Sequence, residues 1–129
     1  MRKILSLLIA ALLVTAMGAF QFITPARALS GALSFTPTYL YFGNQTVGST
    51  SAAQSVTVKN ISGANLQLGK LTITGDFILK STDCRWKLLA PNATCVFSVR
   101  FAPTSAAYKT GIVTVPNNVS ATADTVTLS

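Results

Sequence analysis

Three aspartates are the only acidic side chains in the sequence. Asp76 lies in a predicted turn, Asp83 in a loop, and Asp124 at the start of a predicted strand. At each of these positions aspartate is favoured locally, because its side chain can accept hydrogen bonds from nearby backbone amides. The sequence contains no histidine and no glutamate, so none of the three has the usual partner for general acid–base catalysis. We therefore predict that the protein is not an enzyme.

The two cysteines, Cys84 and Cys95, are the other residues with obvious chemistry. An even number of cysteines in an exported chain favours a disulfide, which would contribute about 3 kcal/mol for so short a loop in the chain-entropy model. A redox-active CxxC pair would need closer spacing, and a zinc site would need histidine or further cysteines. We predict a structural disulfide, with no metal site and no cofactor.

The remaining candidates are residues that could contact a partner. Tyr39 and Tyr41 share one face of a predicted strand, and exposed tyrosines are common in contact surfaces, although packing at a sheet edge is the commoner explanation. Basic residues could attract anionic glycans or lipid head groups, or could simply protect strand faces from aggregation, which is the more common case. The candidate contact surface consists of Tyr39, Tyr41, Arg85, Lys87 and Arg100.

Residues 1–28 have the pattern of a signal peptide. Two basic residues precede a nearly unbroken apolar run over 4–14, and Ala26-Arg27-Ala28 matches the small-residue pattern that signal peptidase cleaves. The alternative is an uncleaved membrane anchor, because the run continues more weakly to Ile23 and about 20 residues span a bilayer. Removing residues 1–28 leaves 101 residues with a net charge of +4 instead of +7, which argues against a nucleic-acid partner. We predict a secreted, periplasmic or cell-surface protein.

Residues 29–129 have the pattern of β-strands and are predicted to form one domain. Polar and apolar residues alternate, as in the run ending at Phe101, where Cys95, Phe97 and Val99 share its face. Turn residues separate the runs, and none shows helical periodicity. Seven or eight short strands in ~100 residues indicate an antiparallel β-sandwich, with Trp86 as its largest core side chain. The predicted strands are Leu33–Phe35, Tyr39–Phe42, Gln54–Asn60, Leu66–Ile73, Phe77–Lys80, Cys95–Phe101, Lys109–Val115 and Thr125–Leu128.

Several short motifs recur in a fixed order along this domain. They are LSFTP (33–37), LYFGNQTVG (40–48), VTVKNISG (56–63), ITGDF (73–77), Cys84, LAPNATC (89–95) and VRFAPT (99–104). Their order and spacing resemble the Ig-like domains of the abnormal-spindle and Hydin (ASH) type, in particular bacterial secreted proteins labelled choice-of-anchor D. The resemblance covers nearly all of residues 32–128. It implies a seven-stranded Ig-like sandwich related to major sperm protein and PapD, with Cys84 and Cys95 bridged, and a module rather than a catalyst.

Three functions are consistent with these features, and for the third, an enzyme or inhibitor with an unrecognised site, we expect no activity. The first is an exported, non-catalytic Ig-like module with a structural, adhesion or protein- or glycan-binding role at the cell surface. The alternative is a periplasmic chaperone-like or strand-accepting domain, whose incomplete last strand would leave an open edge for a strand of its partner. Because domains of this type often occur in tandem or before an anchor, we expect either a stand-alone secreted domain or the front of a longer protein.

Overall fold

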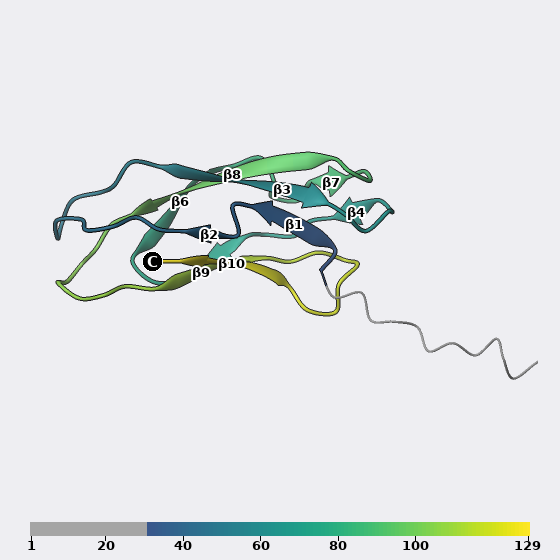
Figure 1. The fold of residues 1–129 in the computed structure, drawn as a ribbon. Helices are drawn as coiled ribbons and strands as arrows, with labels where there is room; N and C mark the ends of the chain where they lie inside the picture. Colours follow the sequence, from purple (N-terminus) through teal and green to yellow (C-terminus); the bar gives the residue numbers. More distant parts are fainter. Residues whose placement is uncertain (1–30) are drawn as a thin grey trace, which may run out of the picture.

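The computed structural model describes residues 31–129, which form two β-sheets packed face to face (Figure 1). The predicted signal peptide over residues 1–28 lies outside the described residues and stays a prediction. Nowhere in residues 31–129 is there a helix with the length and hydrophobicity needed to cross a bilayer.

Eight strands build the two main sheets. The first sheet contains, in spatial order, β1 (Leu33–Thr36), β3 (Gln54–Asn60), β8 (Thr94–Phe101) and β6 (Phe77–Thr82), and it is antiparallel throughout. The second contains β2 (Tyr39–Leu40), β10 (Asp124–Leu128), β9 (Gly111–Val115) and β5 (Thr72–Ile73), with β2 parallel to β10 and the other pairs antiparallel. A two-residue ladder joins β4 (Leu66–Gln67) to β7 (Leu88–Leu89). The predicted all-β, Ig-like sandwich is confirmed.

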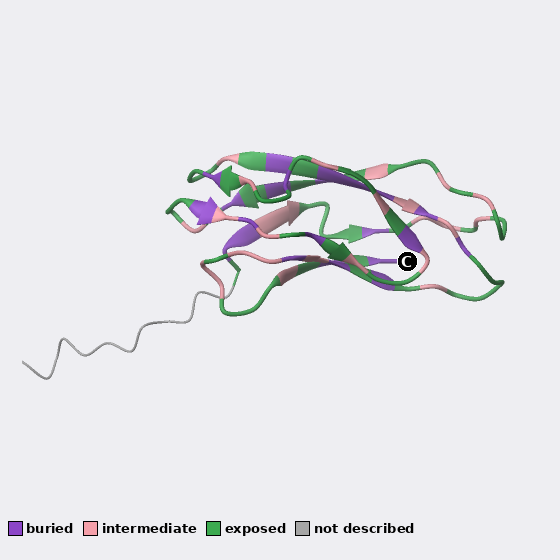
Figure 2. Ribbon diagram, turned by 180° about the vertical axis from the view of Figure 1, so that it is seen from behind, coloured by how far each residue is buried: buried purple, intermediate pink, exposed green. Residues whose placement is uncertain are grey.

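The core lies between the two main sheets and follows the predicted alternation (Figure 2). In β3, Val56 and Val58 are fully buried while Thr57 between them is exposed, and a similar alternation appears in β9 and β10. Phe97 in β8 is the largest fully buried side chain. Trp86 is 63% exposed, so its predicted place in the core is wrong. It lies in the turn between β6 and β7 with a φ of 57°, where the alternation of a strand no longer applies.

The predicted strand Leu66–Ile73 is divided between two ladders. Leu66 and Gln67 pair with β7, whereas Thr72 and Ile73 pair with β9 in the second sheet. Between them the Gly69 amide donates to the Pro116 carbonyl over 2.9 Å. A Cβ at Gly69 would lie 3.0 Å from the Pro116 ring, so a larger residue would obstruct this close crossing. Apolar residues alternate on both sides of Gly69, at Leu66 and Leu68 and then at Leu71 and Ile73, so the sequence suggested one strand although the alternation changes phase between them.

The last strand is paired fully on one side and partly on the other. β10 pairs with β9 over Asp124–Leu128 but with β2 only at Thr127 and Leu128, so the predicted open edge is absent at its C-terminal end and present over 124–126. The edge strand β6 is interrupted by a bulge between Leu79 and Ser81, at Lys80. Bulges and lysines on edge strands discourage pairing with other chains. The strand-accepting alternative therefore loses support at the C-terminal end of β10 and otherwise stays a prediction.

Candidate functional site

The sandwich is elongated along its strands, and its two ends differ (Figure 1). At one end, segments 41–53 and 102–110 lie side by side. The Gly48 amide of the first segment donates a hydrogen bond to the Pro103 carbonyl of the second over 3.0 Å. We call this the groove end. The opposite end carries β4, β7 and the loop 83–87 that contains Cys84, and we call it the disulfide end.

A groove of about 440 Å³ opens between the two segments at the groove end. Tyr41 and Tyr108 stand at its rim, 64% and 80% exposed. Many lining residues have small side chains or none, and these leave the space between the walls open. The lining residues are Tyr41, Gly43, Asn44, Gln45, Val47, Phe101, Pro103, Ser105, Ala106, Ala107, Tyr108, Lys109 and Ser129.

Hydrogen bonds join the walls of the groove to each other and to the sheets. The Ser51 amide donates to the Phe101 carbonyl and the Phe101 amide donates to Ser51 Oγ, each over 2.9 Å. Within the first segment, Gln45 Nε2 donates to Ser49 Oγ over 2.5 Å. These bonds tie a long irregular segment to the end of β8, so the groove has defined walls.

Asp76 holds the second wall of the groove, the segment 102–110, through contacts with two of its residues. Its Oδ2 accepts hydrogen bonds of 2.9 Å from both the amide and the hydroxyl of Thr104, and it lies 3.1 Å from Lys109 Nζ. The backbone hydrogen bond from Thr104 is the main reason why the pKa of Asp76 is lowered, followed by the Lys109 ammonium and the Thr104 hydroxyl. We predicted local turn bonding for this aspartate, whereas it links two segments distant in sequence. Its charge also offsets that of Lys109, the one charged residue that lines the groove.

Three phenylalanines pack beneath the groove. The ring centroids of Phe77 and Phe101 are 5.0 Å apart, and Phe42 lies 5.7 and 6.2 Å from them. Gly111 makes room for this cluster, since a Cβ there would lie 2.6 Å from the Phe77 ring and 2.4 Å from the Thr74 carbonyl oxygen. Aromatic pairs at such separations contribute beyond their buried area, so the floor of the groove is part of the core.

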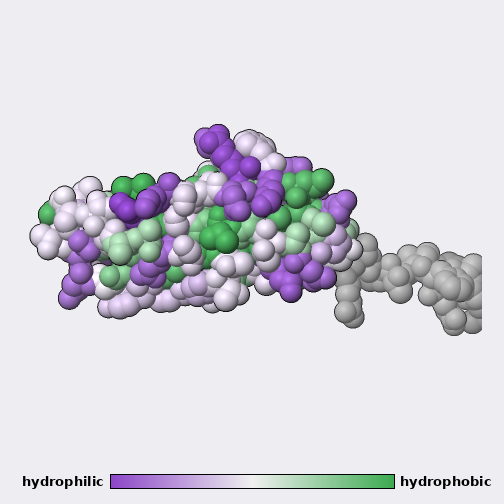
Figure 3. Space-filling view, turned by 90° about the horizontal axis from the view of Figure 1, so that it is seen from above, coloured by the Kyte–Doolittle hydropathy of each residue, from purple (hydrophilic) through white to green (hydrophobic). Residues whose placement is uncertain are grey.

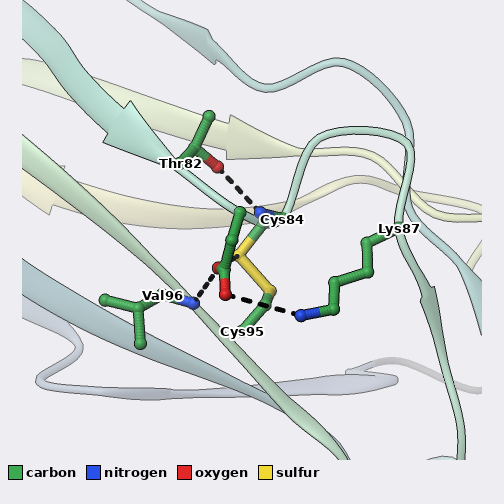
Figure 4. The surroundings of a disulfide bond; sticks show 6 residues. Thr82, Cys84, Lys87, Cys95 and Val96 are labelled. Atoms are coloured by element: carbon green, nitrogen blue, oxygen red, sulfur yellow. Dashed lines mark hydrogen bonds and ion pairs between the residues drawn. A yellow bond between two sulfur atoms is a disulfide. The ribbon is translucent and has the colours of Figure 1, made fainter.

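At the disulfide end, Cys84 and Cys95 are bonded, which confirms the predicted disulfide (Figure 4). Both sulfurs belong to the buried core, and the bond ties the segment after β6 to the start of β8. Asp83 lies beside it, where Oδ1 accepts the Val96 amide over 2.5 Å and Oδ2 is 3.4 Å from Lys87 Nζ. Asp83 therefore also holds two separate segments together.

Asp83, Cys84 and Cys95 are the one group of potential metal ligands among the described residues. Both sulfurs are committed to the disulfide, so neither offers a thiolate. A structural zinc site needs four such ligands. The group therefore has the composition of a structural link, not of a metal centre.

Two further side chains define the disulfide end. Asn60 is fully buried, where its Nδ2 donates to the carbonyls of Ala64 and Leu89 over 2.7 and 2.9 Å. The hydrogen bonds of Trp86 within residues 31–129 involve its backbone, because Gln67 Nε2 donates to its carbonyl over 2.8 Å and its amide donates to the Gly69 carbonyl. Its ring borders a shallow hollow of about 240 Å³. This end presents a protruding tryptophan instead of a groove with polar walls.

The structure does not bring the five predicted contact residues together. Tyr41 lines the groove, whereas Tyr39 lies on β2 with its hydroxyl hydrogen-bonded to Ser129 Oγ. Arg85 and Lys87 lie at the disulfide end, and Lys87 is paired with Asp83. Arg100 is half-buried on β8, and its Nε is buried without a hydrogen-bond partner in the part of the chain that the structure describes. Hydrophilic groups are spread over the face seen in Figure 3, with hydrophobic patches between them. The contact surface remains a prediction.

Sequence reasoning missed most of the groove. Of the five residues in the predicted contact surface, only Tyr41 lines the groove, and Tyr108 and Val47 were not singled out. The available signal was the turn chemistry of Gly43 and Pro103, which marks both segments as loops, where binding residues concentrate. The two loops become neighbours through the pairing of strands in the sheets. A local sequence pattern does not reveal which strands pair.

No protein-family model matches the chain, and no curated protein matches it. Solved structures do match. The secreted serine protease VesC from Vibrio cholerae aligns with 70% of this chain at 15% identity and a TM-score of 0.54, and the match spans 20% of the protease. The chain thus corresponds to about one fifth of that protein's length.

A second match covers a whole domain. The ASH/PapD-like domain 7 of human CEP192 aligns with 83% of this chain and 88% of its own length, at 12% identity and a TM-score of 0.56. At such identities the likeness concerns the fold alone, and fold does not determine function. Together with the sheet topology, it shows that residues 31–129 have an Ig-like β-sandwich fold of the ASH and PapD-like type.

Proposed function

We propose that the protein is an exported, non-catalytic Ig-like module that contacts a protein or glycan at the cell surface. This proposal rests on one observation: the side chains of all three aspartates are bonded to other residues of the domain. Asp76 binds Thr104 and Lys109, Asp83 binds the Val96 amide and Lys87, and Asp124 accepts from Asn117 Nδ2 over 3.0 Å. Each acidic side chain serves as a link between segments, and the sequence has no histidine or glutamate to act in their place.

Export is supported by the disulfide and by the pattern of residues 1–28. Disulfides form and persist in oxidising compartments outside the cytosol. The domain without those residues is small, and small exported domains commonly rely on such bonds for stability. The match to a secreted protease is in keeping with this location.

The export part is tested by expressing the full chain in a bacterium and fractionating the cells. We expect the protein outside the cytosol, with a mass that corresponds to cleavage after Ala28 and with no free thiol. The control is Leu12→Arg, which interrupts the apolar run and should leave an uncleaved, reduced protein in the cytosol. Wild-type protein with retained residues 1–28, or with free thiols, would contradict the proposal.

The contact part is tested with the exported form as bait against intact cells and isolated cell envelopes. We expect saturable retention on the envelope fraction. The same material is assayed for hydrolysis of peptide, ester and glycoside substrates, with none expected. An exported, oxidised protein that is not retained, or that turns over a substrate, would overturn the recognition role while leaving export intact.

A further inference from the structure

We propose that the groove between Tyr41 and Tyr108 is a binding site for a neutral oligosaccharide. This inference rests on the proposed function and specifies both the surface and the ligand class. At about 440 Å³ the groove is within the range of roughly 300–1,000 Å³ typical of small-ligand sites. It lies at the end of the sandwich, between two loops that no strand covers.

The two tyrosines provide aromatic surface without a structural role for their rings. Neither phenol makes a hydrogen bond within residues 31–129, and both side chains are more than half exposed. By contrast, Tyr39 has its hydroxyl bonded to Ser129. One face of a pyranose ring is largely C–H, and such a face stacks on an aromatic ring while the hydroxyls at its edge remain free for hydrogen bonds. Tyr41 and Tyr108 offer this combination at the rim.

The polar groups of the groove suit hydroxyls. The Asn44 side-chain amide has no partner within the described residues, and Gln45 uses its Nε2 on Ser49, so that its Oε1 is open. Ser105 Oγ accepts from Lys109 Nζ over 2.7 Å, which leaves its hydroxyl proton available. Amides and hydroxyls offer donors and acceptors in similar numbers, as sugar hydroxyls require. A peptide in extended form would offer fewer hydroxyl groups to match them.

The charge of the groove selects against ionic ligands. Lys109 is the one charged residue in the lining, and its ammonium lies 3.1 Å from the Asp76 carboxylate. A sulfated or carboxylated sugar would meet a cation that is already paired. A basic ligand would meet no carboxylate side chain among the lining residues. The balance of charge therefore points to a neutral ligand.

The walls are held in place before any ligand binds. The Gly48–Pro103 hydrogen bond joins the two walls, the Ser51–Phe101 hydrogen bonds join the first wall to the end of β8, and Thr104 joins the second wall to Asp76. The phenylalanine cluster supports the floor. A preformed site loses less conformational entropy on binding, so modest contacts with one or two sugar rings suffice for measurable affinity.

The test uses the exported protein and calorimetric or NMR titration with cellohexaose, chitohexaose and laminarihexaose. An oligogalacturonate serves as an anionic probe and decaproline as a peptide probe. We expect at least one neutral hexasaccharide to bind, with affinity reduced about tenfold by Tyr108→Ala or Tyr41→Ala, since rim aromatics dominate such sites. Tyr108→Phe should retain most of the affinity. Trp86→Ala is the matched control, because Trp86 is equally exposed at the opposite end.

Each other outcome overturns the inference in a distinguishable way. Preference for the oligogalacturonate, or decaproline binding that depends on the same tyrosines, would assign the groove to another ligand class. Neutral-sugar binding that is lost in Trp86→Ala but not in the tyrosine variants would move the site to the disulfide end. If no neutral hexasaccharide binds at millimolar concentration while the protein is still retained on envelopes, this inference fails and the proposed function stands. If retention fails as well, both fail.

Discussion

The groove end and the disulfide end of the sandwich are both closed by links between distant segments, but the links differ in kind. At the groove end they are non-covalent: the Phe42, Phe77 and Phe101 rings pack together, and Asp76 binds Thr104. At the disulfide end a covalent bond joins Cys84 to Cys95. The groove end carries aromatic rings both beneath its surface, in the phenylalanine cluster, and outside the core, at Tyr41 and Tyr108, whereas the disulfide end carries Trp86 outside the core.

The ends also differ in their response to acid, with Asp76 at the groove end and Asp124 near the disulfide end, where the neighbour of its partner Asn117 accepts a hydrogen bond from Gln67 of β4. The pKa of Asp76 at the groove end is lowered, chiefly by the Thr104 amide, so its contribution to stability is present above the ordinary value of 3.8 and lost as pH falls through the folded-state pKa. The pKa of Asp124, at the start of β10, is raised by burial, with the Asn117 hydrogen bond opposing. Its contribution is therefore present in acid and lost as pH rises from 3.8 through its folded-state pKa.

The largest effect is expected from Phe77→Ala at the groove end. Phe77 is 5% exposed and stacks on Phe101, and removing a buried phenylalanine side chain costs about 3–5 kcal/mol. Urea unfolding measures the loss. If the variant does not fold, Phe77→Leu keeps most of the volume and should lose less than Phe77→Ala would. A loss under about 1 kcal/mol for Phe77→Ala would mean that the aromatic cluster does not support the groove end.

The next effect is expected from removing the disulfide in the double variant Cys84→Ala, Cys95→Ala. The bond spans 11 residues of sequence, which corresponds to about 3 kcal/mol in the chain-entropy model. Urea unfolding of the exported protein and the variant measures it. In a native-state hydrogen exchange experiment, the amide exchange rates of the variant should rise mainly in β7 and at the start of β8. An equal rise in exchange rates around the groove would show that the two ends are not held independently.

The fold class was predictable because period-2 alternation is local. The runs at β3, β8, β9 and β10 contain their own evidence, and Val56 and Val58 are buried as that pattern requires. Where the chain changes partners the pattern fails. Gly69 allows a crossing against Pro116 that divides one predicted strand between two ladders. Trp86 was assigned to the core from its size, and a left-handed turn places it outside.

The candidate site was predictable only in part, since it is made by two segments that meet through sheet pairing. Tyr41 was noted from its strand face, but its neighbour Tyr108 follows a stretch of small residues without any periodic pattern. The aspartates were expected to bond locally, and Asp76 instead reaches Thr104 across the turn. The turn preference of aspartate identifies a side chain suited to accept hydrogen bonds. It does not identify the residue that donates them.

A smaller effect is expected from the aspartates, and it tests whether the ends respond oppositely to pH. In NMR titrations the Thr104 amide should report a midpoint below 3.8, and the Asn117 side-chain amide a midpoint above it. Asp76→Asn should abolish the first titration and remove the loss of stability in strong acid. Asp124→Asn, its matched counterpart, should abolish the second and remove the gain on mild acidification. Midpoints in the reverse order would contradict the comparison.

The smallest effect is expected from Trp86→Ala at the disulfide end. The ring is 63% exposed, and the contacts that position the residue involve its backbone amide and carbonyl, which alanine retains. Both residues carry a Cβ, so the positive φ of 57° penalises them alike, whereas Trp86→Gly would relieve that strain. We expect urea unfolding of Trp86→Ala to change by no more than about 0.5 kcal/mol, with Trp86→Gly the more stable of the two variants. A loss above 2 kcal/mol would mean that the ring packs as a core residue after all, and the disulfide end would then depend on buried aromatic surface just as the groove end does.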